Sequence, residues 1–504
     1  MVLIFRLLLI SFTLIACNSK PDQDLDIRIF QTSASGDKLT EKSLSKLEIK
    51  PEHIIQINPN KKFQVITGIG AAFTESSASI LNQLSKANRD KIMNAYFSDT
   101  GANYSLTRTH INSCDFSLSS YSYDSVANDT QLIYFDLSRD KNYLIPMIKE
   151  AQAISKEGFK IISSPWTAPP WMKDNNKWKG GKLLPVYYPT WANYLVKYID
   201  EYKKVGIPIW ALTIENEPLG NGGNWESMHY TPQEMASFIK SHLGPTLEKN
   251  KLETELLVYD QNRGEELNVW SSILLTDSIL EPYIYGTAVH WYSSTVDWFP
   301  QSLQQTHAYA PQKHIIQTEG CIDAEIPKWK NDAWYWKKEA TDWGWDWATE
   351  EDKPNHPKYV PTYRYARDII GCMNNWVEGW VDWNMVLDRK GGPNWAKNWC
   401  IAPVIADPEK DEVYFTPLYY VMAHFSKYFR PNSIRVESIS TSNDILVTAV
   451  ENSDGSIAVA VLNEQNDPLA FNLKIGSQSQ IIEIEGRALQ TIVVKGKSIL
   501  KKAN

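Results

Sequence analysis

Two stretches of the chain run from a buried-strand pattern directly into a glutamate. Residues 209–214 (IWALTI) are β-branched, aromatic and apolar, which is typical of a buried strand, and they lead into Asn216 and Glu217. Residues 314–319 (HIIQTE) repeat this design and end in Glu319. A single glutamate at a strand end can simply reach solvent. Two glutamates that both follow a buried-strand pattern predict a carboxylate pair.

Similar apolar runs recur along the chain and alternate with stretches in which apolar residues have helical spacing. The predicted strands, with the run from 209, are 63–73, 104–114, 159–166, 256–260, 287–292, 314–319 and 376–387. The clearest helical patterns cover 75–97, 143–156 and 189–204. Eight strands that alternate with helices predict an α/β fold, a parallel (β/α)8 barrel, or TIM barrel, whose active site lies at the carboxyl ends of its strands.

Polar and aromatic side chains gather at those predicted strand ends. They are Arg108, Asp115, Trp166, Glu217, His290, Tyr292, Glu319, Trp383 and Asn384. One such residue is common, but so many together are hard to explain as solvated surface. For His290 and Tyr292, an ordinary place in the core remains an alternative interpretation.

The pattern changes after about residue 403 to short alternating strands. These are 433–439, 445–450, 457–462, 469–475, 481–484 and 488–494, with a hairpin-type turn, NSDG, at 452–455. We expect the strand within 47–60 to join this all-β module. The sequence therefore predicts a catalytic barrel over 61–402 and a C-terminal β-sandwich domain over 403–504.

The N-terminus has the pattern of a lipoprotein-type signal peptide over residues 1–17. Arg6 precedes the apolar run 7–16, which is too short to span a bilayer, and the run ends in LIAC. LIAC resembles a bacterial lipobox and predicts lipidation of Cys17; an ordinary secretory signal is the alternative. Residues 18–46 are polar and are expected to form a tether. We expect an exported protein, lipid-anchored in a bacterial envelope, in the periplasm or at the cell surface.

Composition and charge limit the classes of partner that this protein is expected to bind. The chain has 504 residues, a net charge of −8 and no Lys/Arg-rich run, so nucleic acid is not expected, and a membrane only through the lipid anchor. The 20 tryptophans fill cores or stack on sugar rings, and those within 329–347 could form a platform for the leaving part of a substrate. No spacing indicates a metal, and oligomeric state is not indicated.

Besides Cys17, four cysteines are scattered along the chain, at positions 114, 321, 372 and 400. We expect buried thiols. A disulfide is possible in an exported protein, but the sequence does not pair them.

A carboxylate pair suits glycoside hydrolysis, in which one group attacks the anomeric carbon and the other protonates the leaving oxygen. Arg108 could keep Glu319 ionised as the nucleophile. Glu217, beside an apolar wall such as Trp166, is the better acid. Asn216 could hydrogen-bond a sugar 2-hydroxyl, whereas His290 and Tyr292 could orient the nucleophile.

Seven motifs occur in order between about residues 60 and 400. They are GIGAAFTE (68–75), Arg108 with SCDFS (113–117), SPWTAPPWMK (164–173), ENEP (215–218), VHWY (289–292), TEGC (318–321), and DWN (382–384) before GGPNW (391–395). Together they resemble glycoside hydrolase family 30, the glucosylceramidase type. Glu75 and Gly320 stand where many members have Asp and Ala, which leaves the subfamily open.

The resemblance implies a (β/α)8 barrel with a side β-sandwich built from both termini, hydrolysis by double displacement with retention, and no cofactor. It implies Glu217 as the acid/base and Glu319 as the nucleophile. The implied glycone-binding residues are Arg108, Asp115, Trp166, Asn216, His290, Tyr292, Trp383 and Asn398. The expected substrate is a β-glucosyl linkage, as in glucosylceramidases. An endo-β-1,6-glucanase is the alternative, and a non-catalytic glycan-binding lipoprotein is a more remote one.

Overall fold

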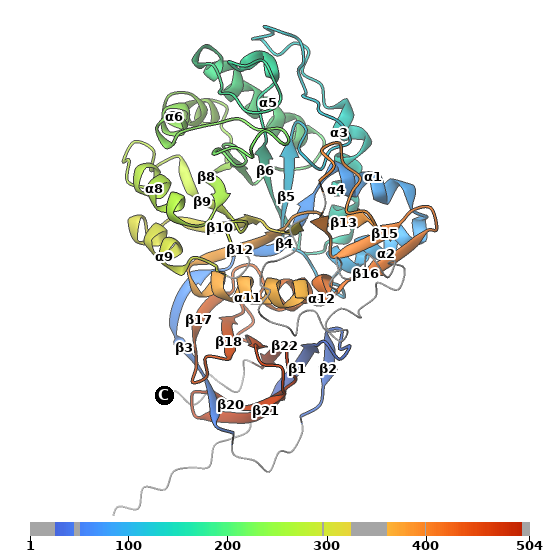
Figure 1. Ribbon diagram of the computed structural model, residues 1–504. Coiled ribbons are helices and arrows are strands. Elements are labelled where there is room, and N and C mark those ends of the chain that lie inside the picture. Colours follow the sequence, from blue (N-terminus) through green and yellow to red (C-terminus); the bar gives the residue numbers. More distant parts are fainter. Residues whose placement is uncertain (1–25, 45–50, 295–296, 324–359, 399, 496–504) are drawn as a thin grey trace, which may run out of the picture.

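The computed structural model describes residues 26–44, 51–294, 297–323, 360–398 and 400–495 (Figure 1). Eight parallel strands close a barrel in the order β4, β5, β6, β7, β8, β9, β10, β12. Their bounds are Gly68–Phe73, Leu106–Ile111, Lys160–Pro165, Ala211–Thr213, Glu255–Asn262, Ile284–His290, His314–Glu319 and Val377–Asp382. The predicted (β/α)8 barrel is confirmed, and each of the eight predicted strands contributes to it.

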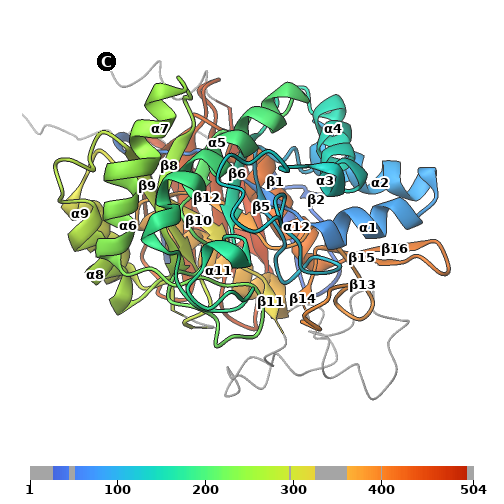
Figure 2. The ribbon, with the colours of Figure 1, turned by 90° about the horizontal axis from the view of Figure 1, so that it is seen from above.

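Helices surround the barrel strands, as Figure 2 shows from above. They are α1 (Glu75–Gln83), α2 (Lys86–Phe97), α3 (Ser138–Asn142), α4 (Leu144–Ile154), α5 (Tyr188–Lys204), α6 (Pro232–Phe238), α7 (Gly244–Lys249), α8 (Glu265–Leu274), α9 (Pro300–Tyr309), α11 (Val360–Asn374) and α12 (Pro417–Tyr428). The predicted helix over 75–97 is two helices, because the Ser85 side chain caps a new helix by accepting from the backbone N–H of Asn88.

One apolar layer fills the lower barrel. Its buried members come from seven of the eight strands: Leu106, Ile162, Ala211, Leu257, Ala288, Ile316 and Val381. The remaining strand, β4, approaches closely through glycine. A Cβ on Gly70 would lie 2.1 Å from the Leu106 carbonyl oxygen, so this contact requires glycine. Side chains two residues further along each strand also face inward, toward the barrel mouth.

A nine-stranded sheet forms the second region, in the order β2, β1, β22, β19, β18, β17, β3, β20, β21. Its bounds in chain order are Ile27–Thr32, Thr40–Lys42, His53–Val65, Ile434–Ser440, Ile445–Glu451, Ile457–Asn463, Leu469–Ile475, Gln478–Ile484 and Leu489–Val494. The sheet has its own core, which includes Ile57, Val459 and Phe471. Strands from both ends of the chain therefore build the side module, as predicted.

The N-terminal prediction is wrong in part. Residues 27–42 of the predicted tether (18–46) contain β1 and β2, and β1 pairs antiparallel with β22. The short run IRIF in β1 was not predicted as a strand because polar residues surround it in the sequence; the sheet buries part of this strand. The proposed signal peptide with Cys17, and the tryptophans of 329–347, lie outside the described residues.

The predicted domain boundary at 402/403 also differs from the structure. Short strands β13 (Val386–Asp388), β15 (Val404–Asp407) and β16 (Glu412–Phe415) form one small sheet. Helix α12 then packs against both β4 of the barrel and β22 of the side module. The all-β region therefore begins near β17, about thirty residues after the predicted boundary.

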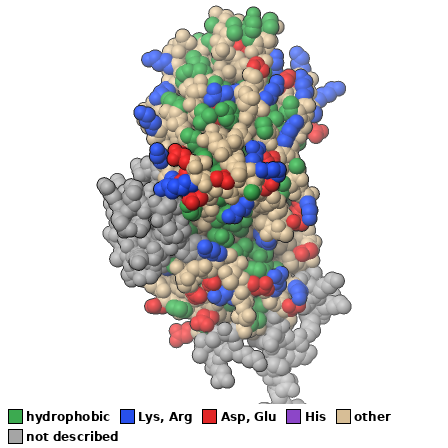
Figure 3. All heavy atoms as spheres, turned by 90° about the vertical axis from the view of Figure 1, so that its right-hand side faces the viewer, with side chains coloured by type: hydrophobic (Ala, Val, Ile, Leu, Met, Phe, Trp, Pro, Cys, Tyr) green, Lys and Arg blue, Asp and Glu red, His purple; other side chains and the backbone are tan. Residues whose placement is uncertain are grey.

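The described surface is mixed in charge on the face seen in Figure 3, where basic and acidic side chains lie interspersed. Such a face lacks the single-sign field that would concentrate a highly charged polymer. Within the part of the chain that the structure describes, every helix is too short or too polar to cross a bilayer.

Candidate active site

A polar layer lies directly above the apolar layer of the barrel. Arg108, His290 and Thr318 each follow a member of the apolar layer by two residues, so they also point inward. Ser164, Thr213 and Trp383 have the same offset. The strand period thus explains how these residues reach the mouth of the barrel.

Asp260 and Glu319 do not share that offset, and irregular pairing places them. Strand β8 shifts register between Tyr259 and Gln261, and Tyr259 and Asp260 have positive φ values of 76° and 56°. Strand β10 shifts register between Gln317 and Glu319. Such irregularities re-aim side chains and are frequent next to active sites. Both carboxylates are turned into the polar layer in this way.

Arg108 is the centre of this layer, and its side chain is fully buried. The guanidinium forms an ion pair with Glu319 and donates to Asp260 at 2.8 Å. It also donates to Asn216 Oδ1 at 2.8 Å and to Ser164 Oγ at 3.0 Å. A planar, five-donor group can satisfy this many acceptors, so Arg108 sets the relative positions of four strand ends.

Asp260 and His290 form a buried charged pair beside Arg108. His290 Nε2 lies 2.9 Å from Asp260 Oδ1, which also accepts from the Thr318 hydroxyl at 2.7 Å. Burial alone would lower the pKa of His290, but the carboxylates of Glu319 and Asp260 raise it to about 9. Burial alone would raise the pKa of Asp260, but the charges of Arg108 and His290 hold it well below its ordinary value. At neutral pH the layer therefore contains an imidazolium and a carboxylate.

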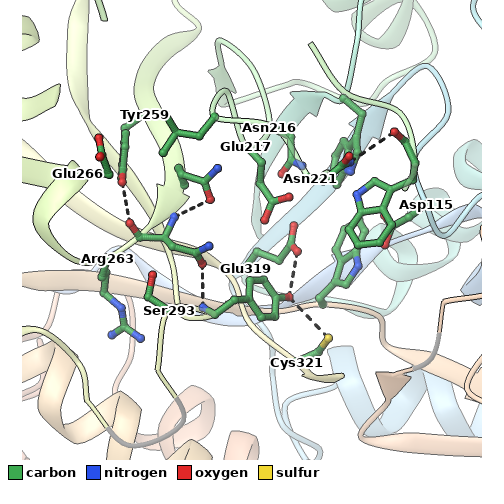
Figure 4. Close-up of a pocket in the computed structure, with 18 of the residues that line it drawn as sticks. Asp115, Asn216, Glu217, Asn221, Tyr259, Arg263, Glu266, Ser293, Glu319 and Cys321 are labelled. Atoms are coloured by element: carbon green, nitrogen blue, oxygen red, sulfur yellow. Dashed lines mark hydrogen bonds between the residues drawn. The ribbon is translucent and has the colours of Figure 1, made fainter. Parts of the chain in front are cut away.

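Glu217 and Glu319 approach each other across the mouth, and Figure 4 shows both carboxylates in the same part of the pocket. One carboxylate oxygen of each and a ring nitrogen of His290 lie within 4.8 Å of one another. Glu217 follows β7 with a φ of 50°, a left-handed conformation that costs of order 1–3 kcal/mol for a residue other than glycine. Its backbone N–H donates to the Asp260 carbonyl at 2.9 Å, which helps to hold this turn.

The two carboxylates have different surroundings. Glu319 accepts from Arg108 and from the Tyr292 hydroxyl, the latter at 2.9 Å. Burial raises the pKa of the Glu319 carboxyl, while the charges of His290 and Arg108 oppose that rise. The Glu217 side chain is 14% exposed and lies 3.5 Å from His290 Nδ1. Glu319 is therefore the more firmly held of the two, and Glu217 is the more open to the pocket.

The end of the pocket is closed by a buried wall. Trp166 and Trp383 stack with ring centroids 5.2 Å apart, and Arg108 lies 4.9 Å from the Trp166 ring centroid. Asp115 is buried there and accepts from Asn398 Nδ2 at 3.1 Å. Burial, and then the nearby Glu319 charge, raise the pKa of Asp115 well above its ordinary value. This combination of flat aromatic faces and hydrogen-bonding groups suits a single sugar ring.

The cavity has a volume of about 550 Å³, and eight of the ten sequence-predicted site residues line it. They are Asp115, Trp166, Asn216, Glu217, Tyr292, Glu319, Trp383 and Asn398. Arg108 and His290 lie behind this lining and act through the carboxylates. Asn384 accepts instead from the Thr74 hydroxyl at 2.7 Å and does not line the cavity.

Sequence reasoning missed several residues of the cavity and its support. Asp260 ends the predicted strand 256–260, so the strand-end rule could have found it. The outer part of the cavity is lined by residues that carried no such signal: Asn221, Trp225 and Ser293 from loops, Gln261 from β8 and Glu266 from α8. Cys321 and Cys400 also lie in the lining, with their sulfur atoms 2.7 Å apart.

Glu217, His290 and Glu319 form the one group in the described residues whose ligand atoms come close enough to hold a metal ion. His290 argues against that use. With its pKa raised to about 9 the ring is protonated at neutral pH and offers no lone pair to a metal. The three groups are better described as a charged, hydrogen-bonded cluster.

A barrel that presents two facing glutamates in a tryptophan-lined pocket defines a glycoside hydrolase. The models of the glycosyl hydrolase family 30 TIM-barrel domain and β-sandwich domain match residues 66–429 and 432–492, respectively. The chain belongs to glycoside hydrolase family 30. The matched division near residue 430 agrees with the observed start of the all-β region.

The relatives include glucosylceramidases and endo-1,6-β-glucanases. The lysosomal acid glucosylceramidase of Mus musculus is 33% identical over 430 residues, covering 83% of this chain and 79% of that protein. An endo-1,6-beta-D-glucanase of Neurospora crassa is 27% identical over 427 residues, covering 81% of each. A solved endo-β-1,6-glucanase structure matches with a TM-score of 0.79 and 28% identity, covering 93% of this chain and 100% of the other. The resemblance found in the sequence is thus confirmed.

Proposed function

We propose that the protein is a retaining hydrolase of β-glucosyl linkages, with Glu217 as the acid/base and Glu319 as the nucleophile. The observation that carries the proposal is the approach of the two carboxylates to within 4.8 Å. Retaining enzymes hold their carboxyl groups about 5–5.5 Å apart, whereas inverting enzymes leave about 6.5–9.5 Å for a water molecule.

The contacts support this division of roles. A nucleophile must be ionised, and Glu319 receives the Arg108 guanidinium and the Tyr292 hydroxyl, both of which favour its charged form. An acid/base must exchange protons with the leaving group and with water, and Glu217 is the carboxylate that is more open to the pocket.

The reaction proceeds in two displacements. Glu319 attacks the anomeric carbon as the glycosidic C–O bond breaks, and Glu217 donates its proton to the leaving oxygen. Glu217 then removes a proton from water, which attacks the same carbon, releases Glu319 and yields the sugar with its original configuration. In this proposal Asn216, whose Oδ1 accepts from Arg108, hydrogen-bonds the sugar 2-hydroxyl during both steps.

For the substrate, the buried wall of the pocket favours removal of one terminal glucose. Asp115, Trp166 and Trp383 are each at most 5% exposed, so they close this end of the pocket. The identity of 33% to a glucosylceramidase supports the same reading. Endo-β-1,6-glucanase activity is the second candidate, because a solved enzyme of that activity is covered over its full length.

Product analysis separates these candidates. The purified protein is incubated with glucosylceramide, an aryl β-glucoside and β-1,6-glucan. Glucose from the first two, with the glucan intact, is the result expected. Short β-1,6-linked oligosaccharides would identify the endo-glucanase instead. Glu319→Gln is the control for a non-catalytic glycan-binding protein: binding without turnover in both forms would contradict the proposed activity.

We also propose that the protein is exported and anchored by a lipid on Cys17, on the strength of the LIAC motif after the apolar run 7–16. Metabolic labelling with an alkyne fatty acid should mark the wild-type protein and leave Cys17→Ala unmarked. Equal labelling of both, or of neither, would contradict the anchor.

A further inference from the structure

The sulfur atoms of Cys321 and Cys400 lie 2.7 Å apart in the wall of the active-site cavity. A disulfide bond is about 2.03–2.05 Å long, so the two sulfurs are within about 0.7 Å of bonding distance. The backbone holds them together. Strands β11 (Ile322–Asp323) and β14 (Cys400–Ile401) pair antiparallel, with Asp323 opposite Cys400.

The other two cysteines of the barrel have different surroundings. The Cys114 sulfur accepts from the Ser117 hydroxyl at 3.7 Å. The Cys372 sulfur contacts Arg263 and lies 3.5 Å from Asp368 Oδ2. The geometry therefore distinguishes Cys321 and Cys400 from the remaining pair.

We propose that Cys321 and Cys400 form a disulfide that closes one side of the substrate pocket next to Glu319. The proposal relies on the proposed export, because disulfides persist in oxidising compartments. The oxidant is a small disulfide such as oxidised glutathione, and both cysteines belong to the lining of the cavity.

The exchange balances in two steps. One cysteine thiolate attacks the small disulfide and releases one glutathione thiol; the second cysteine then attacks the mixed disulfide and releases the other. Two protein thiols and one oxidised glutathione thus give one protein disulfide and two glutathione thiols.

The bond would act on two groups of the pocket. The Cys321 sulfur lies 3.6 Å from the Tyr292 hydroxyl, which donates to Glu319. Cys400 is two residues after Asn398, whose side-chain amide donates to Asp115 in the buried wall of the pocket. A covalent link between these segments pre-orders both sides of the pocket, and pre-ordering improves binding chiefly by lowering the entropy lost on association. Reduction should therefore raise KM roughly two- to tenfold and change kcat less.

Peptide mapping tests the bond independently of activity. The full-length protein is equilibrated with oxidised glutathione, quenched with acid, denatured, alkylated and digested without reductant. A linked peptide containing Cys321 and Cys400 is expected, with Cys114 and Cys372 alkylated. Alkylation of all four, or a link that includes Cys114 or Cys372, would overturn the proposal. Since no substrate is used, this result does not depend on the proposed function.

Matched variants test the role in the pocket. Cys400→Ser should lose the response of KM to the reductant TCEP, whereas Cys372→Ser, whose sulfur lies outside the cavity lining, should keep it. TCEP should also lower the Tm of the wild type by roughly 3–5 °C and leave that of Cys400→Ser unchanged. If Cys400→Ser does not fold, Cys321→Ser replaces it. An unchanged wild-type KM after complete reduction would contradict the role in binding.

Discussion

The Asp260 carboxylate joins two buried cations, and its replacement tests the electrostatics of the site most sharply. Asp260→Asn keeps the shape of the side chain and removes its charge. One carboxylate oxygen lies 2.9 Å from Nε2 of His290, and the other accepts from Arg108 at 2.8 Å. An amide has one acceptor oxygen, so its NH2 group must face one of these two donors.

Of these two hydrogen bonds, the one to Arg108 is the more costly to lose. We therefore expect the amide oxygen to face Arg108 and the amide NH2 to face His290. The ring then loses the charge and the hydrogen bond of Asp260, so its pKa should fall below about 9, while the nearby Glu319 carboxylate still opposes the effect of burial. Each pKa unit that is lost corresponds to about 1.4 kcal/mol of stabilisation of the charged ring.

The sign of the pH dependence follows from the same values. The pKa of folded His290, about 9, is above its ordinary value of 6.5. The stabilisation is therefore fully present below pH 6.5 and is lost as the pH rises through 9. In the wild type this group should lower the free energy of unfolding by roughly 3 kcal/mol over that interval. In Asp260→Asn that part of the slope should be smaller, because one of the two carboxylates that raise the His290 pKa is gone.

Urea unfolding followed by tryptophan fluorescence, from about pH 6 to about pH 9.5, measures the difference. Asp277→Asn is the matched control. Asp277 pairs with Lys240 at the surface, at 2.9 Å, and its loss should cost at most about 1 kcal/mol without changing the slope. If Asp260→Asn retains the wild-type slope, Asp260 does not contribute to the raised pKa of His290, and the account of this pair is wrong.

Three further substitutions test the proposed acid, Glu217, and two groups that contact Glu319. Glu217→Gln should lower kcat/KM by about 10²–10⁴-fold on substrates with poor leaving groups and far less on activated aryl glucosides, with azide restoring turnover; equal losses on both would remove its role as acid. Tyr292→Phe deletes one hydrogen bond to charged Glu319 and should reduce kcat/KM by roughly 10- to 100-fold; a steady-state value equal to that of the wild type would show that the bond is not used. Arg108→Lys leaves buried acceptors unpaired and should lower the free energy of unfolding by about 3–5 kcal/mol, measured by urea unfolding; a loss below about 1 kcal/mol would contradict the network.

The barrel was predictable because its strands are buried on both faces. Continuous apolar runs such as 159–166 and 314–319 leave little choice of structure, and the polar groups at their ends mark the barrel mouth. Regular alternation then places Arg108 and His290 correctly. These features depend on local pattern alone, so the sequence contains them.

The residues that escaped prediction depend on departures from regularity. The place of Asp260 at the end of the predicted strand 256–260 was visible in the sequence, but its orientation into the site depends on a register shift in β8, which has no local signature. Strand β1 was not recognised because its pairing partner, β22, lies near the other end of the chain. The proximity of Cys321 to Cys400 likewise arises from the β11–β14 pairing. These features depend on pairing between residues that are far apart in the sequence, so they could not be predicted from local pattern.

The most direct test of the central claim is to trap the glycosyl–enzyme intermediate. The protein is incubated with a 2-deoxy-2-fluoro-β-glucosyl fluoride, which forms the intermediate faster than water can release it, and the labelled peptide is sequenced by mass spectrometry. The account predicts one fluoroglucosyl group on Glu319 and none in Glu319→Gln. A label on Glu217 or elsewhere, or hydrolysis with inversion and no label, would contradict it.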